Sequence, residues 1–157
     1  MEATIDEFGP DDVAWATSLL TADFGAAVVV SRGVAHDATT LPGFVARVDG
    51  ERVGLATYRM SGEECELVTI NGRGVGEPLL AAVVSRAREL GCRRLWLVTT
   101  NDNTRALRFY QRQGWDLAAL HRASVTAARV IKPSIPLLGE DGIPIRHELE
   151  LELVLTE

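Results

Sequence analysis

The sequence predicts an α/β (α+β) fold in one domain over residues 1–157. The chain is 46% hydrophobic and 24% charged, which is typical of a globular protein. A chain of this length buries roughly two thirds of its unfolded surface in a single core. Its first half favours strands around a hairpin and its second half alternates helices with strands, while no linker or repeat divides it.

The first half predicts one helix among several strands. Gly9-Pro10-Asp11-Asp12 opens a helix, because apolar residues follow it at helical spacing, and the helix ends near Phe24-Gly25. Asp49-Gly50 predicts a hairpin turn, since glycine tolerates the positive φ of a tight turn. The strands expected here cover residues 4–8, 44–48, 52–58 and 64–70.

The second half predicts two helices and three strands. A helix follows the glycine-rich segment 71–76 and stops at Gly91, and another covers 103–113 and stops at Gly114. In residues 148–153 glutamate and leucine alternate strictly, which predicts a half-exposed strand whose charges discourage edge pairing. The other expected strands are 94–99 and 115–120.

Charge and composition exclude several classes of function. The formal net charge is −6, with no basic cluster to neutralise a phosphate backbone, so we expect no nucleic-acid partner. No apolar run approaches the ~20 residues of a membrane span, and the acidic N-terminus is unlike a signal peptide, so a cytoplasmic protein without a membrane partner is expected. Cys65 and Cys92 form no CxxC motif and the histidines are scattered, so no metal site is predicted.

Three glycines in six residues lie between a predicted strand and a predicted helix. Gly72, Gly74 and Gly76 let the backbone fold around an anion, with N–H groups and the helix N-terminus directed at it. The spacing is neither that of a Rossmann fingerprint nor that of a P-loop. A phosphate-binding loop and a merely tight turn both explain it.

The segment Asn103 to Trp115 forms the second motif. Asn103 suits a helix cap, Ala106, Phe109 and Tyr110 share one helix face, and Gly114 suits the helix end. The alternative for these residues is an ordinary capped helix with a buried aromatic face.

Together, over roughly residues 64–120, the two segments resemble the GNAT superfamily of acyl-CoA-dependent N-acetyltransferases. The family's phosphate loop reads Gln/Arg-x-x-Gly-x-Gly/Ala, which Gly74 and Gly76 match, whereas Asn71 stands at the Gln/Arg position. Its later motif, Asn-x-x-Ala-x-x-Phe-Tyr-x-x-x-Gly-Phe/Trp, is matched from Asn103 to Trp115 without a gap. Arg73 would supply the charge that Asn71 lacks.

The resemblance implies a GNAT-like fold: a mixed, mostly antiparallel central sheet with helices on both faces, splayed between the fourth and fifth strands. It also implies acetyl-CoA as acyl-donor cosubstrate without a metal, with pantetheine beside strand 64–70 and pyrophosphate on the loop. The residues expected to bind the cofactor are Leu67, Val68, Thr69, Asn71, Gly72, Arg73, Gly74, Val75, Gly76, Asn103, Ala106 and Tyr110.

The reaction implied is direct attack of a primary amine on the thioester, with the oxyanion stabilised by strand N–H groups near Val68. By the resemblance Tyr110 is the acid that protonates the leaving thiolate. Glu64 and Glu66 share strand parity beside the expected slot, so either one is a candidate base, and Glu66 is preferred. Both can equally be solvated carboxylates beside a chain of water molecules.

Residues 121–147 form an insertion that the family core does not need. Arg129 and Lys132 lie three residues apart, so on a helical turn they would share a face and bind an anionic group of the acceptor. Their alternative is two solvated charges near a helix C-terminus.

We therefore predict an N-acetyltransferase that acts on a small-molecule or peptide amine which the sequence does not identify. A non-catalytic acyl-CoA-binding or sensor module is the main alternative, and a nucleotide-binding module is a third. A homodimer is possible.

Overall fold

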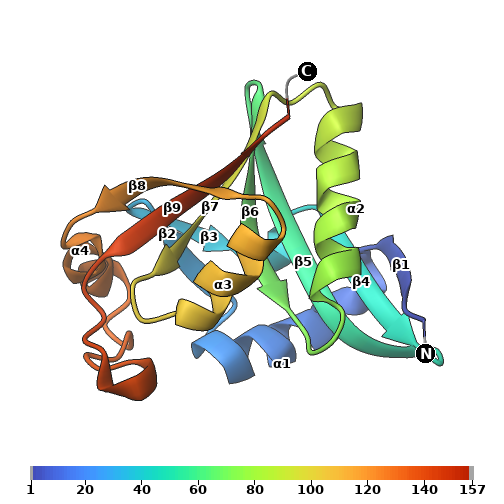
Figure 1. Ribbon diagram of the computed structural model, residues 1–157. Helices are drawn as coiled ribbons and strands as arrows, with labels where there is room; N and C mark the ends of the chain where they lie inside the picture. The colour runs from blue at the N-terminus through green and yellow to red at the C-terminus, as the bar shows by residue number, and fades with distance from the viewer. Residues whose placement is uncertain (1, 156–157) are drawn as a thin grey trace. The chain divides into compact units, whose positions relative to one another are not determined.

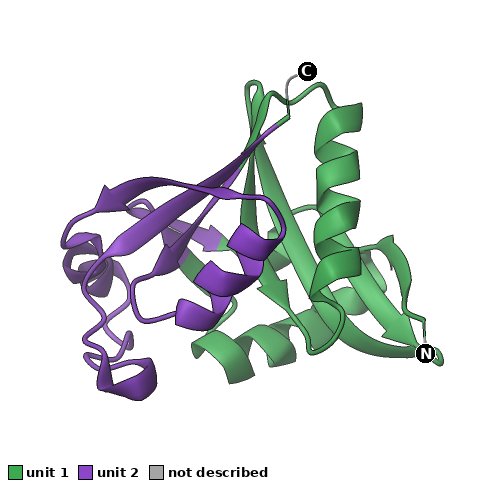
Figure 2. Ribbon diagram, in the orientation of Figure 1, with its two compact units in different colours: residues 1–29, 37–95, 155–157 green, residues 30–36, 96–154 purple. Residues whose placement is uncertain are grey.

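The computed structural model describes residues 2–155, which form two compact units (Figure 2). Unit 1 contains residues 2–29, 37–95 and 155, and unit 2 contains residues 30–36 and 96–154. The fold is α+β, with a mixed, mostly antiparallel seven-stranded sheet in the order β1-β4-β5-β6-β7-β9-β8 (Figure 1). Strands β2 and β3 form a separate two-stranded sheet.

The elements that begin in unit 1 are β1 (Thr4–Glu7), α1 (Val13–Phe24), β2 (Val28–Ser31), β4 (Gly43–Val48), β5 (Glu51–Ser61), β6 (Glu64–Asn71), α2 (Gly76–Glu89) and β7 (Arg94–Thr100). Those that begin in unit 2 are β3 (Val34–Asp37), α3 (Thr104–Arg112), β8 (Asp116–His121), α4 (Ser124–Ile131) and β9 (Glu148–Val154). Short 3-10 turns cover Pro10–Asp12, Ala38–Thr40 and Glu140–Gly142.

Unit 1 is built on an antiparallel series of strands, β1-β4-β5-β6. The predicted hairpin turn is confirmed: Asp49 and Gly50 join β4 to β5 with φ of 52° and 80°. The predicted end of the first helix is confirmed as well, because Gly25 follows α1 at φ 81° and donates its N–H to the carbonyl of Thr21.

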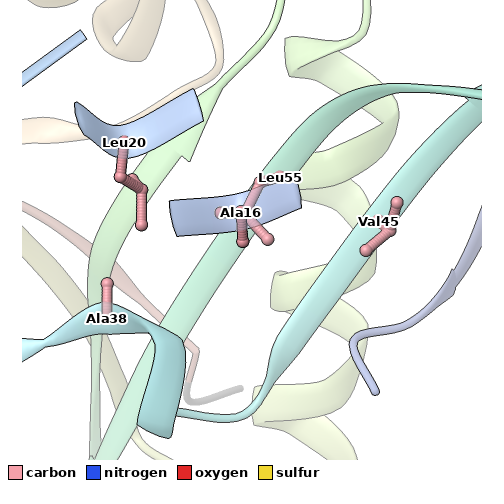
Figure 3. Packing of buried hydrophobic residues seen from close by; sticks show 5 residues of the cluster. All are labelled: Ala16, Leu20, Ala38, Val45 and Leu55. Carbon is pink, nitrogen blue, oxygen red and sulfur yellow. The ribbon is translucent and has the colours of Figure 1, made fainter. Parts of the chain in front are cut away.

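Helices α1 and α2 cover opposite faces of this series. On one face Ala16 and Leu20 of α1 pack with Ala38, Val45 and Leu55, all five of them fully buried (Figure 3). On the other face α2 lies so close to β5 that a Cβ added to Gly54 would be 2.5 Å from Val75 and 3.0 Å from Leu79. Since β5 has helices on both sides, its residues 54–58 are all buried.

Three features differ from the sequence prediction. Strands β2 and β3, joined by Arg32 and Gly33 at positive φ, were not expected. The insertion contains a helix, α4. The expected edge character of residues 148–153 is wrong, because β9 lies between β7 and β8, where its Glu150 contacts His121 Nε2 at 2.8 Å. No helix within residues 2–155 is long and apolar enough to span a membrane.

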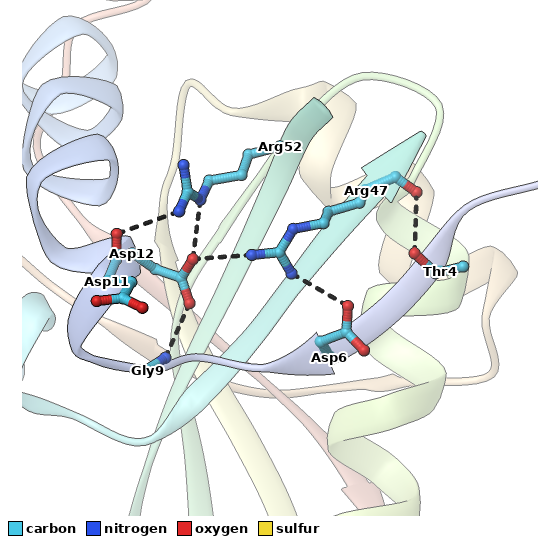
Figure 4. A network of polar contacts seen from close by, with 7 residues as sticks. All are labelled: Thr4, Asp6, Gly9, Asp11, Asp12, Arg47 and Arg52. Carbon is cyan, nitrogen blue, oxygen red and sulfur yellow. Dashed lines mark hydrogen bonds and ion pairs between the residues drawn. The ribbon is translucent and has the colours of Figure 1, made fainter. Parts of the chain in front are cut away.

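A buried carboxylate ties the start of α1 to the β4–β5 hairpin (Figure 4). Asp12 accepts hydrogen bonds from the Gly9 backbone N–H at 2.9 Å, Arg47 at 3.0 Å and Arg52 at 2.8 Å. Burial by itself would raise the pKa of Asp12, but the Gly9 hydrogen bond and the two guanidinium groups outweigh it and lower the pKa. The ionised form therefore stabilises the fold.

Asp12→Asn is expected to lower the free energy of unfolding by about 2 kcal/mol at pH 7, because two arginines lose a buried charged partner. The folded-state pKa of Asp12 lies below its ordinary value of 3.8. Its contribution is therefore complete above that value and is lost as the pH falls through the folded-state pKa. Urea unfolding of both proteins from pH 7 to pH 3 measures this, with the exposed neighbour Asp11→Asn as control. An equal stability difference at every pH would contradict the charge-based account.

Candidate functional site

A β-bulge in β6 determines which of its side chains face α1. Thr57 pairs with Thr69 and the next residue, Tyr58, pairs with Leu67, so Val68 is the extra residue of the bulge. The bulge brings Glu66 opposite Arg59, whereas an unbroken register would place it opposite Met60 on the other face. The backbone of Val68, expected to stabilise the oxyanion, is thus outside the regular β5–β6 register.

Glu66 and Glu64 differ sharply in environment. The side chain of Glu66 is 3% exposed, and its Oε1 lies 3.5 Å from Nη2 of Arg59. The side chain of Glu64 is 49% exposed and pairs with Arg94 at 3.1 Å. Only Glu66 combines burial with a position beside the bulge, which distinguishes two residues that strand parity alone could not separate.

Further polar side chains follow the same face of β5 and β6. The hydroxyl groups of Thr57 and Thr69 are 2.7 Å apart. Asn71 donates from Nδ2 to Asp23 of α1 at 2.7 Å, and its buried Oδ1 has no hydrogen-bond partner among the described residues. The Asn71 amide therefore contacts α1, and its donor is not available to the glycine loop that follows.

The glycine loop requires its first glycine for space and conformation. Gly72 has φ 128°, and a Cβ there would lie 2.7 Å from the Val53 carbonyl oxygen and 2.8 Å from Cα of Gly54. Gly74 has φ 74° but faces open space. Helix α2 begins at Gly76 without a side-chain cap, so its first N–H groups can bind an anion. Arg73 on this loop is exposed.

In unit 2 the second motif forms the capped helix that its residues indicate. Asn103 accepts from the Ala106 backbone N–H at 3.2 Å and donates to Thr99 at 3.1 Å. Tyr110 is 5% exposed and its ring packs 5.3 Å from that of Trp115. Burial raises the pKa of Tyr110, so its hydroxyl group stays protonated at neutral pH.

Arg129 of the insertion contacts backbone carbonyl groups of the same segment. The guanidinium of Arg129 donates to the carbonyls of Ile135, Pro136 and Ile145, at 3.2, 2.5 and 2.8 Å. Lys132 lies directly after α4, where burial lowers its pKa. Arg129 thus holds the loop that follows α4, and its expected contact with an anionic group of the acceptor stays a prediction.

The sequence did not single out two charged residues, Arg59 and Asp102, whose contacts the structure shows. Arg59 lies in a long strand where only the bulge reveals its partner. Asp102 accepts from Thr100 at 2.6 Å and from the Glu140 backbone N–H at 3.2 Å, which links the β7–α3 loop to the insertion. Within residues 2–155 no group of histidine, cysteine, aspartate and glutamate is arranged to hold a metal ion.

Comparison with known proteins places this geometry in a family. Residues 12–115 match the family model described as Acetyltransferase (GNAT) family. Over 120 residues, 73% of this chain and 75% of its relative, the chain is 40% identical to the uncharacterized protein YdhI of Bacillus subtilis.

Solved structures share the fold at low sequence identity. An IAA acetyltransferase from Bacillus cereus aligns with TM-score 0.77 and 20% identity, covering 98% of this chain and 100% of that one. A GNAT family acetyltransferase from Elizabethkingia anophelis, solved with acetyl-CoA bound, aligns with TM-score 0.69 and 20% identity, covering 98% of both chains.

Gly72→Ala is expected to destabilise the protein more than Gly74→Ala. Both residues have positive φ, which costs about 1–2 kcal/mol for an added Cβ, but only Gly72 also meets backbone atoms. Thermal and urea unfolding of the two variants measure the difference. If Gly74→Ala were the less stable protein, the close approach of Gly72 to β5 would not be what shapes the loop.

Proposed function

Since the chain belongs to the acetyltransferase (GNAT) family, we propose that it transfers the acetyl group of acetyl-CoA to a primary amine of a small molecule or peptide. One observation carries this proposal: β6 and the glycine loop after it bring a bulge at Val68, a buried carboxylate at Glu66 and an uncapped helix N-terminus within eleven residues, 66–76. These three features suit acyl transfer from a thioester that carries a pyrophosphate.

Binding of acetyl-CoA is proposed to use the backbone of unit 1. The N–H groups from Gly72 to Gly76 and the N-terminus of α2 bind the pyrophosphate, and exposed Arg73 adds charge. Pantetheine lies along β6 at Leu67, Val68 and Thr69. Asn103, Ala106 and Tyr110 of unit 2 are assigned to cofactor binding by the family motif alone.

The proposed reaction is a direct transfer. The acceptor nitrogen attacks the thioester carbonyl carbon, a C–N bond forms, and the oxyanion is stabilised by N–H groups near Val68. Glu66 takes the proton that the amine must lose, directly or through water. The C–S bond then breaks, and the departing sulfur takes a proton from the Tyr110 hydroxyl group, which solvent restores.

The cysteine nearest to Glu66 does not suit a covalent route. Cys65 is 1% exposed, and burial, followed by the neighbouring Cys92 and Glu66, raises its pKa to about 12. A thiol in this state is a poor nucleophile at neutral pH, since the thiolate is the reactive form. Direct transfer therefore fits the residues of unit 1 better than an acetyl-cysteine intermediate.

One observation favours the alternative of a non-catalytic acyl-CoA-binding or sensor module. Asn71 stands where the family usually has Gln or Arg, and its amide contacts Asp23. A chain that binds acetyl-CoA without turnover would need neither a base nor an acceptor site.

Acetyl-CoA is expected to raise the melting temperature and to be consumed when a panel of amines is added. At 100 times the dissociation constant it stabilises the native state by about 2.7 kcal/mol, or roughly 5–10 °C for a chain of this size. NAD and ATP serve as controls in thermal scans, and thiol release measures turnover. A thermal response without turnover of any amine would favour the sensor module, and no response to acetyl-CoA would contradict both functions.

Glu66→Gln is expected to lower kcat by about 10²-fold or more at neutral pH, because it keeps the shape of the side chain but cannot accept the proton. Glu64→Gln is the matched control on the same strand and should retain kcat, since Glu64 is half exposed and paired with Arg94. The KM for acetyl-CoA should stay constant in both. Equal kcat in all three proteins would assign proton removal to water.

A further inference from the structure

Arg59 is a cation beside the proposed base that the reaction described above does not use. It lies on the same face of β5 as Thr57, and its guanidinium faces Glu66 across the strand pair. Its side chain is 37% exposed, whereas that of Glu66 is 3% exposed. Arg59 is therefore the more accessible member of this ion pair.

The ion pair leaves Arg59 incompletely satisfied. Its contact with Glu66 joins Nη2 to Oε1 at 3.5 Å, which is long for a charge-assisted hydrogen bond. Its Nε is buried and has no hydrogen-bond partner among residues 2–155. A buried donor without an acceptor is costly, and a guanidinium binds a carboxylate through two parallel N–H groups. The group best suited to Arg59 is thus a second carboxylate.

We propose that Arg59 binds a carboxylate of the acceptor. The acceptors are then α-amino acids or other amines whose carboxylate is bonded to the carbon that carries the nitrogen. This inference rests on the proposed acetyltransferase function and names the substrate class of the same site. The chemistry required is an amine that approaches Glu66 together with a carboxylate that approaches Arg59.

The spacing of the two protein charges favours this class. Glu66 and Arg59 are direct cross-strand neighbours, and an α-amino acid carries its amine and its carboxylate on one carbon. The acceptor can therefore present each group to its partner at the same time. A simple alkyl amine would leave Nε of Arg59 unpaired, and a peptide N-terminus would offer it a neutral amide.

The experiment compares each amino acid with its decarboxylated counterpart. The pairs are L-alanine and ethylamine, L-phenylalanine and phenethylamine, and L-lysine and cadaverine, with L-phenylalanine amide as a neutral analogue. The variants are Arg59→Gln, Arg59→Lys and the control Arg93→Met, whose side chain is 69% exposed. Thiol release from acetyl-CoA gives kcat/KM for every combination.

Within one protein, the ratio of kcat/KM for an amino acid to that for its counterpart cancels any general damage to Glu66. We expect the wild-type protein to prefer at least one amino acid by about tenfold or more. Arg59→Gln should abolish the preference mainly through KM for the amino acid, Arg59→Lys should keep part of it, and Arg93→Met should keep all of it. The KM for acetyl-CoA should not change.

Two results would overturn the inference while leaving the acetyltransferase function intact: a preference for the decarboxylated amines or the amide, and an amino-acid preference that survives in Arg59→Gln. Binding of acetyl-CoA without turnover of any amino acid would overturn it as well. Failure of acetyl-CoA to raise the melting temperature would instead refute the proposed function itself.

Discussion

The burial of β5 on both faces is the constraint on which unit 1 depends. Helix α1 covers one face and α2 the other, so residues 54–58 lie inside the unit. The face toward α1 nevertheless carries Thr57 and Arg59, and polar groups in such a place must find partners. Thr57 contacts Thr69 of β6, and Arg59 contacts Glu66 of β6 while its Nε has no partner among the described residues. The polar row of the candidate site is thus a direct consequence of two-sided burial.

The bulge at Val68 decides the composition of that row. One extra residue in β6 changes which face every earlier side chain of the strand occupies. Glu66 comes to lie with Thr57 and Arg59, while Cys65 comes to lie opposite Met60 on the other face. The same distortion removes the backbone of Val68 from the regular ladder. The one extra residue of the bulge, Val68, therefore produces both the buried carboxylate and the irregular backbone beside it.

Local signals were sufficient for most elements of the fold and for two motifs. Asp49-Gly50 and Gly25 have the backbone conformation that their residue types predict, and Asn103 caps α3. The separation of Glu66 from Glu64 and the pairing of Arg59 could not be predicted, because they depend on a register shift that no residue type specifies. Strands β2 and β3 had a usable signal in Arg32-Gly33 between two β-rich segments. The edge position predicted for residues 148–153 was wrong, because alternation does not reveal whether a strand lies at an edge.

In unit 2 the loop between β7 and α3 gives three adjacent residues three structural tasks. Asn103 caps α3, which carries Tyr110. Asp102 fits so closely against Gly139 that a side chain at 139 would collide with its carboxylate, and Asn101 accepts from the backbone N–H groups of Arg146 and His147. The insertion is thus fastened to the loop that starts the second motif. Asn103, which caps the helix that carries Tyr110, directly follows Asn101 and Asp102, so the contacts of the insertion support the loop from which that helix begins.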